Sequence, residues 1–386
     1  MSLSRRSFLR TLGASSAGIA AFPAIAGRGR EALLAQGTDS RRADRLLAAR
    51  PGVIRIDSNE NPYGAGERVY AAIRAHLTES NRYPVKSEDD LVAEIARVQR
   101  IKPENVILGS GSGELLRAAV SGFTNRDHGI VAPEPTFEAP ANWAKFIGSP
   151  IIPVPVDSEL RLDLGAMADR GKGAGLVYLC NPNNPTATVL GGGPISDYVE
   201  RVNRSSPDTT ILIDEAYFEY VDLPDYRTAI PIALANPRVV VTRTFSKVFG
   251  MAGLRVGYAV GQPATLAKMA AWLLGSNVSQ LSLIAAIATV GNNARIAVEQ
   301  RQNRANRKLT RGWFEKAGYQ VADADANFMM VNIRRDAKQF KLDCLKRNVA
   351  VGRQFPSHPT WTRVTVGTLE EMRKAIPVFA TVLGAA

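Results

Sequence analysis

Residues 244–258 read Thr-Phe-Ser-Lys-Val-Phe-Gly-Met-Ala-Gly-Leu-Arg-Val-Gly-Tyr and directly follow the apolar run Val239–Val241, which predicts a buried strand. Lys247 is the only lysine of this segment and lies between the strand end and a run of glycines and apolar residues. A lone lysine is usually a solvated surface charge. This setting instead predicts an enclosed lysine, whose lowered pKa suits attack on a carbonyl carbon. Arg255, in the same segment, suits the binding of an anion.

Outward from this segment, short apolar runs alternate with amphipathic stretches of helical period. The runs predict strands at residues 106–108, 129–131, 176–179, 211–213 and 239–241, and the stretches 114–123 and 194–203 predict helices. This alternation favours an α/β fold with a mainly parallel sheet covered by helices on both faces. A long polar helix over residues 294–317 follows, then short strands at 328–333 and 363–366 with a helix at 340–347 between them. These elements predict a second, smaller domain.

Three more polar segments directly follow predicted strands, where ligands bind in parallel sheets. Gly109–Glu114 is a glycine-rich turn before a helix, and such turns expose backbone N–H groups suited to a phosphate. Cys180–Thr186 follows the next of these strands, although asparagine and proline are common in any turn. Asp214–Tyr217 begins with an acid, which at a strand end more often caps a helix or binds a metal. Each segment alone is weak evidence for a site.

Together and in this order, the four segments resemble the class I and II aminotransferases of fold type I, which depend on pyridoxal 5′-phosphate (PLP), and most closely their histidinol-phosphate aminotransferase-like branch. The resemblance covers residues 51–386 and includes Asn59–Gly64, Arg82–Pro84 and Arg363–Thr368. It implies an α/β large domain over residues 67–292, with a mainly parallel seven-stranded sheet. It also implies a small α+β domain over residues 293–386 and an N-terminal arm, residues 51–66, that packs with the small domain.

The resemblance implies catalytic roles for Lys247, Asp214 and Tyr217. Lys247 would hold the cofactor as an internal aldimine and move the proton from the substrate Cα. Asp214 would pair with the pyridine nitrogen and keep it protonated. Tyr217 and Asn184 would form hydrogen bonds to the ring's 3′-oxygen, and Phe137 would stack on the ring.

The remaining implied contacts hold the phosphate and the substrate. The residues that would bind the phosphate are Ser112, Gly113, Ser246, Arg255 and, from the neighbouring subunit of a homodimer with shared active sites, Tyr83. Arg363 would bind the substrate α-carboxylate in a bidentate pair. Arg353 and Tyr63 would also contact the substrate.

Two positions leave questions open. Ala187 stands where the family has a glycine, so this turn must accept a Cβ with at most a small backbone shift. Arg353 corresponds to an arginine that contacts the substrate phosphate in the histidinol-phosphate branch. It could instead bind another anionic group or a carboxylate of the amino donor, or be a surface arginine before a turn.

The expected reaction is transfer of an amino group from an amino acid, or an amino-phosphate-like donor, to a 2-oxo acid such as 2-oxoglutarate. Two alternatives remain on the same scaffold, because a fold does not fix a reaction: decarboxylation of a phosphorylated amino acid, or a PLP-dependent oxidation. A non-catalytic PLP-binding protein is a third reading. The combination of Lys247, Asp214 and Arg363 argues against it.

The N-terminus resembles a twin-arginine export signal over residues 1–26. Arg5 and Arg6 precede Phe8-Leu9, a mildly apolar stretch follows, and Ala24-Ile25-Ala26 fits a cleavage site. A membrane anchor or a disordered tail is the alternative, but the apolar stretch is short for a span. The signal predicts export of a folded protein, to the periplasm of a bacterium, with residues 27–50 as a linker. Export argues against histidinol phosphate as the substrate, since histidine biosynthesis is cytoplasmic.

Composition excludes other classes of protein. The 386 residues carry a formal net charge of +12, but the basic residues are scattered, with no run that would indicate nucleic-acid binding. The chain has 2 cysteines, and no Cys/His cluster with metal spacing, so neither a disulfide framework nor a metal site is expected. No segment after the signal is long and apolar enough for stable membrane insertion.

Overall fold

The computed structural model describes residues 48–385; the predicted twin-arginine signal over residues 1–26 and most of the predicted linker lie outside the described residues. The described residues from Ile54 onward form one compact unit. All strands and the helices from α4 to α15 belong to the unit that begins at Ile54.

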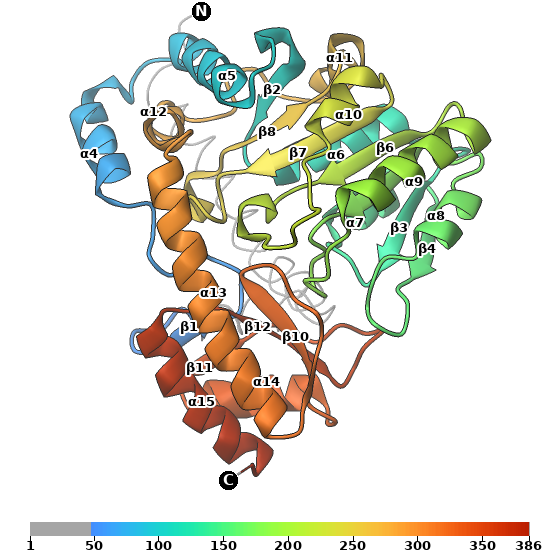
Figure 1. Cartoon of the computed structure of the whole chain (residues 1–386). Helices are drawn as coiled ribbons and strands as arrows, with labels where there is room; N and C mark the ends of the chain where they lie inside the picture. Colours follow the sequence, from blue (N-terminus) through green and yellow to red (C-terminus); the bar gives the residue numbers. More distant parts are fainter. Residues whose placement is uncertain (1–47, 386) are drawn as a thin grey trace, which may run out of the picture. The chain divides into compact units, whose positions relative to one another are not determined.

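A seven-stranded sheet forms the largest layer of this unit (Figure 1). Its strands are β2 (Val106–Gly109), β3 (Ile130–Glu134), β4 (Ile151–Pro155), β5 (Leu176–Cys180), β6 (Thr210–Asp214), β7 (Val239–Thr244) and β8 (Gly257–Val260). Their order is β2-β8-β7-β6-β5-β3-β4, and only β8 runs antiparallel to its neighbours. The predicted α/β fold with a mainly parallel seven-stranded sheet is therefore confirmed.

Helices cover both faces of the sheet, which explains why its central strands are apolar throughout rather than alternating. In β5, Tyr178 and Cys180 pack on one face with the helices α6 (Ser112–Phe123), α7 (Ala139–Phe146) and α11 (Pro263–Ala270). Val177 and Leu179 pack on the other face, in the core shared with α8 (Leu164–Arg170), α9 (Gly192–Ser205) and α10 (Ile230–Ala235). The same core also receives α5 (Val85–Gln99), α12 (Gln280–Thr289) and Val69 of α4 (Glu67–Ala75).

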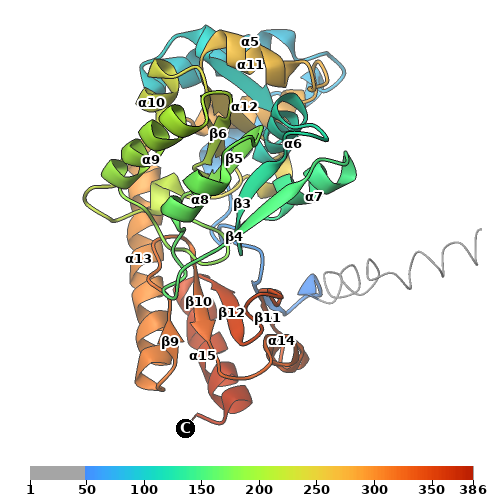
Figure 2. The same cartoon turned by 90° about the vertical axis from the view of Figure 1, so that its right-hand side faces the viewer.

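The long helix α13 (Asn293–Lys316) leads from α12 to the C-terminal elements (Figures 1 and 2). These elements are β9 (Gln320–Val321), β10 (Phe328–Asn332), α14 (Ala337–Lys346), β11 (Val349–Val351), β12 (Trp361–Thr365) and α15 (Leu369–Leu383). The strands β12, β10 and β9 form an antiparallel sheet, while β11 pairs in parallel with β1 (Ile54–Ile56). One hydrophobic core runs through these elements and the seven-stranded sheet, so the domain boundaries remain predictions.

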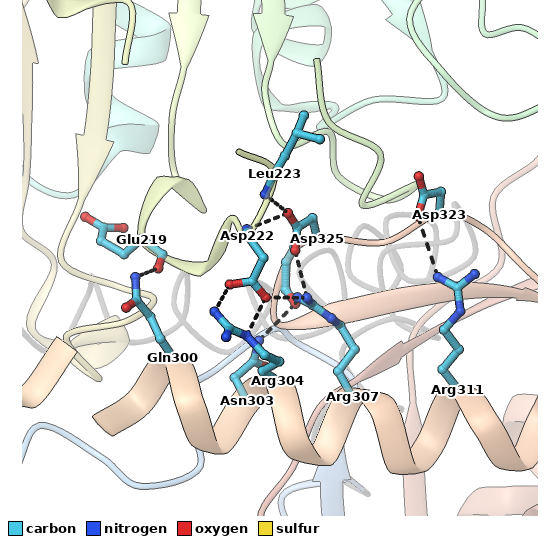
Figure 3. A network of polar contacts seen from close by, with 11 residues as sticks. Glu219, Asp222, Leu223, Gln300, Asn303, Arg304, Arg307, Arg311, Asp323 and Asp325 are labelled. Atoms are coloured by element: carbon cyan, nitrogen blue, oxygen red, sulfur yellow. Dashed lines mark hydrogen bonds and ion pairs between the residues drawn. The ribbon is translucent and has the colours of Figure 1, made fainter. Parts of the chain in front are cut away.

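Charged side chains fix α13 to two loops (Figure 3). Arg307 pairs with Asp325 at 2.7 Å and with Asp222 at 3.1 Å. Asp325 also accepts hydrogen bonds from the backbone N–H groups of Asp222 and Leu223, at 2.6 and 3.0 Å. Arg304 of the same helix pairs with Asp222. The loop after β6 is thereby held against the loop before β10.

Apolar helices raise the question of a membrane span. Across residues 48–385, no single helix has both the length and the apolarity to cross a bilayer. One strongly bent pair, α12 with α13, passes the test on length and composition only.

Candidate active site

The predicted site segments gather at one edge of the sheet. Strands β5, β6 and β7 run parallel with paired registers, and they end at Cys180, Asp214 and Thr244. The loops that follow these strands therefore begin side by side. The strand β2 runs in the same direction, because it and β7 are both antiparallel to β8, and its glycine-rich turn opens at the same edge.

Lys247 lies in the loop after β7, partly buried. Its Nζ donates a hydrogen bond to the backbone oxygen of Asn59 at 3.1 Å and lies 5.4 Å from the centroid of the Tyr217 ring. Burial, and then the nearby charge of Arg363, lowers the pKa of Lys247 to about 8. A substantial fraction of this amine is therefore neutral near pH 8, as a nucleophile or proton acceptor requires.

Asp214 is buried at the end of β6 and, within residues 48–385, receives hydrogen bonds only from neutral donors. Its Oδ2 accepts from the Tyr178 hydroxyl at 3.2 Å and its Oδ1 from the Thr242 hydroxyl at 3.1 Å. Burial raises the pKa of the Asp214 carboxyl to about 6. A buried carboxylate without a cationic hydrogen-bond partner is costly, and a protonated ring nitrogen is the kind of partner that would stabilise it.

Asn59 connects Lys247 to Tyr217, a contact that the sequence did not predict. Its side-chain Nδ2 donates to the Tyr217 hydroxyl at 3.2 Å, and its Oδ1 accepts from the Thr365 hydroxyl at 2.9 Å. Asn59 has φ 53°, a left-handed conformation that asparagine tolerates better than most residues. It was part of a matching motif, but no local signal shows its partner 158 residues away.

A buried ion pair fixes the start of the loop after β6. Arg243 and Glu215 are 5% and 2% exposed at the side chain, and their closest atoms lie 2.8 Å apart. The Arg243 guanidinium also lies 3.7 Å from the centroid of the Phe218 ring. Because Glu215 adjoins Asp214, this pair fixes the backbone that carries the acid.

The turn before α6 and the loop after β7 form a cradle for an anion. A Cβ at Gly111 would collide with the Arg255 guanidinium, and one at Gly257 would collide with the backbone nitrogen of Ser112. Arg255 donates to the Ser246 hydroxyl at 3.4 Å, and no carboxylate within residues 48–385 forms an ion pair with it. Glycines thus allow a guanidinium without a carboxylate partner among the described residues, a hydroxyl and a helix N-terminus to converge, which fits a phosphate.

Arg363 of β12 points toward the loop after β5. Its two terminal nitrogens donate to the Asn184 side-chain oxygen at 2.8 Å and to the Asp57 backbone oxygen at 2.6 Å, while its Nε is buried without a partner. Burial lowers the pKa of Arg363 to about 10, so it stays charged at neutral pH. A half-buried guanidinium that forms no ion pair with a carboxylate among residues 48–385 fits a substrate carboxylate.

Arg353 forms an ion pair that the sequence did not predict. Its guanidinium lies 2.7 Å from a carboxylate oxygen of Glu138 and 4.3 Å from the centroid of the Phe355 ring. Glu138 directly follows Phe137, whose side chain is partly exposed. No pattern around Glu138 indicates a partner in the C-terminal part of the chain.

Four other positions singled out in the sequence lie as follows. Gly113 lies in the first turn of α6, directly after Ser112. The Tyr63 hydroxyl accepts a hydrogen bond from Asn306 at 3.3 Å. Tyr83 is 87% exposed, and no hydrogen bond or ring contact joins it to another part of the described chain. Ala187 is buried with φ 62°, so the turn accepts its Cβ in a left-handed conformation.

Sequence comparisons with known proteins show the family to which the chain belongs. Residues 51–379 match the family model for aminotransferase class I and II. The histidinol-phosphate aminotransferase of Halalkalibacterium halodurans is 30% identical over 334 residues, covering 86% of this chain and 89% of that protein. That of Symbiobacterium thermophilum is 32% identical over 336 residues, covering 86% of this chain and 91% of that protein.

A solved structure shares the fold. The histidinol-phosphate aminotransferase from Sinorhizobium meliloti, in complex with pyridoxal-5′-phosphate, superposes with a TM-score of 0.81 at 23% identity. The match covers 89% of this chain and 94% of that one.

Proposed function

The chain belongs to the class I and II aminotransferases, which depend on PLP, and from this premise we propose which of its residues carry the reaction. The enzyme transfers an amino group from a donor to a 2-oxo acid, in two half-reactions that share one site. The observation that carries the assignment of residues is that Lys247, Asp214 and Arg363 come together where the strands of the sheet end, and that none of them forms an ion pair with another described residue.

The described residues fit the cofactor. Residues that would hold its phosphate are Ser112, Gly113, Ser246 and Arg255; those that would hold its ring are Phe137, Asn184, Asp214 and Tyr217. When bound, PLP supplies an electrophilic carbonyl carbon and an electron-accepting ring. Asp214 contributes a carboxylate in a dry setting, where it holds a proton on the ring nitrogen most strongly.

Lys247 acts as the nucleophile and proton carrier. Its lowered pKa leaves Nζ able to accept the proton from the donor Cα without a strong external base. Asn59 positions this amine through its backbone oxygen and the Tyr217 hydroxyl through its side chain. Burial raises the pKa of Tyr217, so its phenol stays neutral and can donate a hydrogen bond.

Arg363 orients the donor by its α-carboxylate. Its bonds to Asn184 and Asp57 fix the guanidinium plane, so little freedom is lost when a carboxylate binds. Tyr63 and Arg353 would lie toward the rest of the substrate. The relatives are named for histidinol phosphate, but we infer an amino acid donor for this chain, because an exported enzyme would not meet a cytoplasmic intermediate.

Two finer features belong to the same proposal. The enzyme would be a homodimer in which the exposed Tyr83 of one subunit reaches the phosphate in the other subunit's site. It would also be exported by the twin-arginine route to the periplasm. Replacing Arg5→Lys together with Arg6→Lys should leave the uncleaved protein in the cytoplasm, and normal export of that variant would rule out the route.

A spectral screen of donors tests the proposed reaction. Purified holoenzyme is mixed with single amino donors in the absence of a 2-oxo acid, and absorbance and product are followed. Accumulation of pyridoxamine phosphate supports amino transfer. Release of carbon dioxide, or consumption of oxygen, without pyridoxamine phosphate would favour the decarboxylase or the oxidase instead.

A further inference from the structure

We propose that Glu138 is a specificity-determining residue: its ion pair with Arg353 makes the side-chain end of the substrate site unfavourable for donors that carry a phosphate or a second carboxylate. The inference rests on the proposed function, since it deepens how that site selects its donor. It concerns selection by charge and requires no new chemical step.

The position of Glu138 is fixed relative to Arg363. Thr136, two residues before it, donates to the Asn183 side-chain oxygen at 2.8 Å, and Asn183 donates back to the Pro135 backbone oxygen at 3.0 Å. The next residue, Asn184, accepts from Arg363 at 2.8 Å. Two short links therefore connect the segment that carries Glu138 to the arginine proposed for the donor α-carboxylate.

Arg353 is fixed to the same arginine from the other side. The backbone N–H of Gly352 donates to the backbone oxygen of Arg363 at 2.9 Å. The guanidinium groups of Arg353 and Arg363 lie 4.3 and 6.0 Å from the centroid of the same Phe355 ring. The charges of both Arg353 and Glu138 influence the pKa of Arg363, in opposite directions, which places both near its guanidinium.

The pair is therefore next to the carboxylate-binding arginine, yet it is open to solvent. The side chains of Arg353 and Glu138 are each 41% exposed, whereas Arg363 is half-buried and its Nε is fully buried. A donor held at Arg363 would extend into this open part of the site. Its side chain would meet a cation whose charge Glu138 already compensates.

Because Glu138 compensates the charge of Arg353, the site prefers donors with an uncharged side chain. An anionic side chain would have to displace Glu138 from Arg353 and then stay near a free carboxylate of the same sign. An uncharged side chain leaves the pair intact and meets no such cost. The same bias applies to 2-oxoglutarate relative to an uncharged 2-oxo acid, because both half-reactions use one site.

The test measures donor preference in the half-reaction of the holoenzyme. O-phospho-L-serine and L-glutamate, which both carry an α-carboxylate and an anionic side chain, serve as anionic donors, and L-leucine serves as the uncharged one. Glu138→Gln should raise kcat/KM for the anionic donors, relative to L-leucine, by roughly three- to tenfold, mainly through a lower KM. Glu200→Gln, which removes an exposed carboxylate paired with Arg204 on α9, should leave the ratio unchanged.

Glu138→Asp separates charge from shape, because it keeps the carboxylate. It should retain the wild-type preference within about a factor of two. The proposal is wrong if Glu138→Gln reacts with all donors but leaves the ratio unchanged, or if Glu138→Asp shifts the ratio as far as Glu138→Gln. A wild-type enzyme that reacts with none of many donors would instead contradict the proposed function, and the selectivity with it.

Discussion

Asp214 and Lys247 are ionisable groups whose pKa values are shifted toward each other by burial. The pKa of the carboxyl rises to about 6 and that of the amine falls to about 8. Each shift reports a charge that the surrounding protein solvates poorly. Such shifts concentrate at functional sites, and here both groups lie where the parallel strands end.

Replacing Asp214→Asn should slow the half-reaction about a hundredfold or more while PLP remains bound. The phosphate contacts and Lys247 would still hold the cofactor, but the charge that stabilises the protonated ring nitrogen in the transition state would be gone. Stopped-flow rates and bound PLP are compared with wild type, using one good donor. A variant that reacts at nearly the wild-type rate would show that Asp214 does not pair with the ring nitrogen.

Replacing Lys247→Met should stabilise the apoprotein at pH 7 by about 1–3 kcal/mol. Between pH 8 and 10.5 the unfolded lysine binds a proton that the folded one does not, so wild-type stability rises with pH across this window. The advantage of the variant should therefore be largest below pH 8 and disappear above pH 10.5. Urea unfolding at several pH values measures it, with Lys374→Met as an exposed control.

The sequence predicted the local part of the site and missed its long-range contacts. The resemblance implied roles for Lys247, Asp214 and Asn184, and each of them follows a buried strand within a few residues, where ligands of parallel sheets bind. The partners of Asn59 and Glu138 could not, since they come from segments far along the chain that only tertiary packing brings near. The proposed contact of Tyr83 lies in the neighbouring subunit, so no pattern within one chain indicates it.

At the level of elements, α13 is attached to its neighbours by contacts of unequal burial (Figure 3). Arg307 and Asp325 pair with side chains only 11% and 14% exposed. Arg311, one turn further on, reaches Asp323 at 3.6 Å in an exposed pair. The buried pair should therefore carry most of the stabilisation.

Replacing Asp325→Ala should lower the free energy of unfolding by about 2–4 kcal/mol. The change leaves two backbone N–H groups, those of Asp222 and Leu223, without their acceptor, and Arg307 with one partner fewer. The matched control Arg311→Ala should cost less than about 1 kcal/mol. Chemical denaturation measures the free energy of unfolding of both variants. Equal decreases in the two variants would contradict the expectation that the buried pair contributes more than the exposed one.

The strands show which elements sequence patterns can predict. Apolar runs predicted β5, β6 and β7 because both faces of these strands are buried. The strand β4 was missed, since Pro153 and Pro155 argue against a strand, although both are tolerated at the sheet edge. The antiparallel β8 was missed because its first two residues lie inside a segment interpreted for its chemistry.

For the whole molecule, the proposed dimer makes a specific prediction about shared sites. Tyr83→Ala and Lys247→Ala should each be nearly inactive alone. In a mixed dimer, the subunit with an intact Lys247 receives Tyr83 from its partner. Refolding the two variants together in equal amounts should therefore restore about a quarter of wild-type activity, because half the dimers are mixed and each has one complete site. No recovery from a mixture shown to form hybrid dimers would mean that Tyr83 serves its own subunit.

The central claim is that Lys247 supports amino transfer rather than another PLP reaction. The most direct measurement supplies ¹⁵N-labelled amino acids, without glutamate, alanine or aspartate, together with unlabelled 2-oxoglutarate, pyruvate and oxaloacetate. The account predicts ¹⁵N in newly formed glutamate, alanine or aspartate with the wild-type enzyme and none with Lys247→Ala. Release of carbon dioxide or ammonia without a labelled amino acid product, or undiminished transfer by Lys247→Ala, would contradict it.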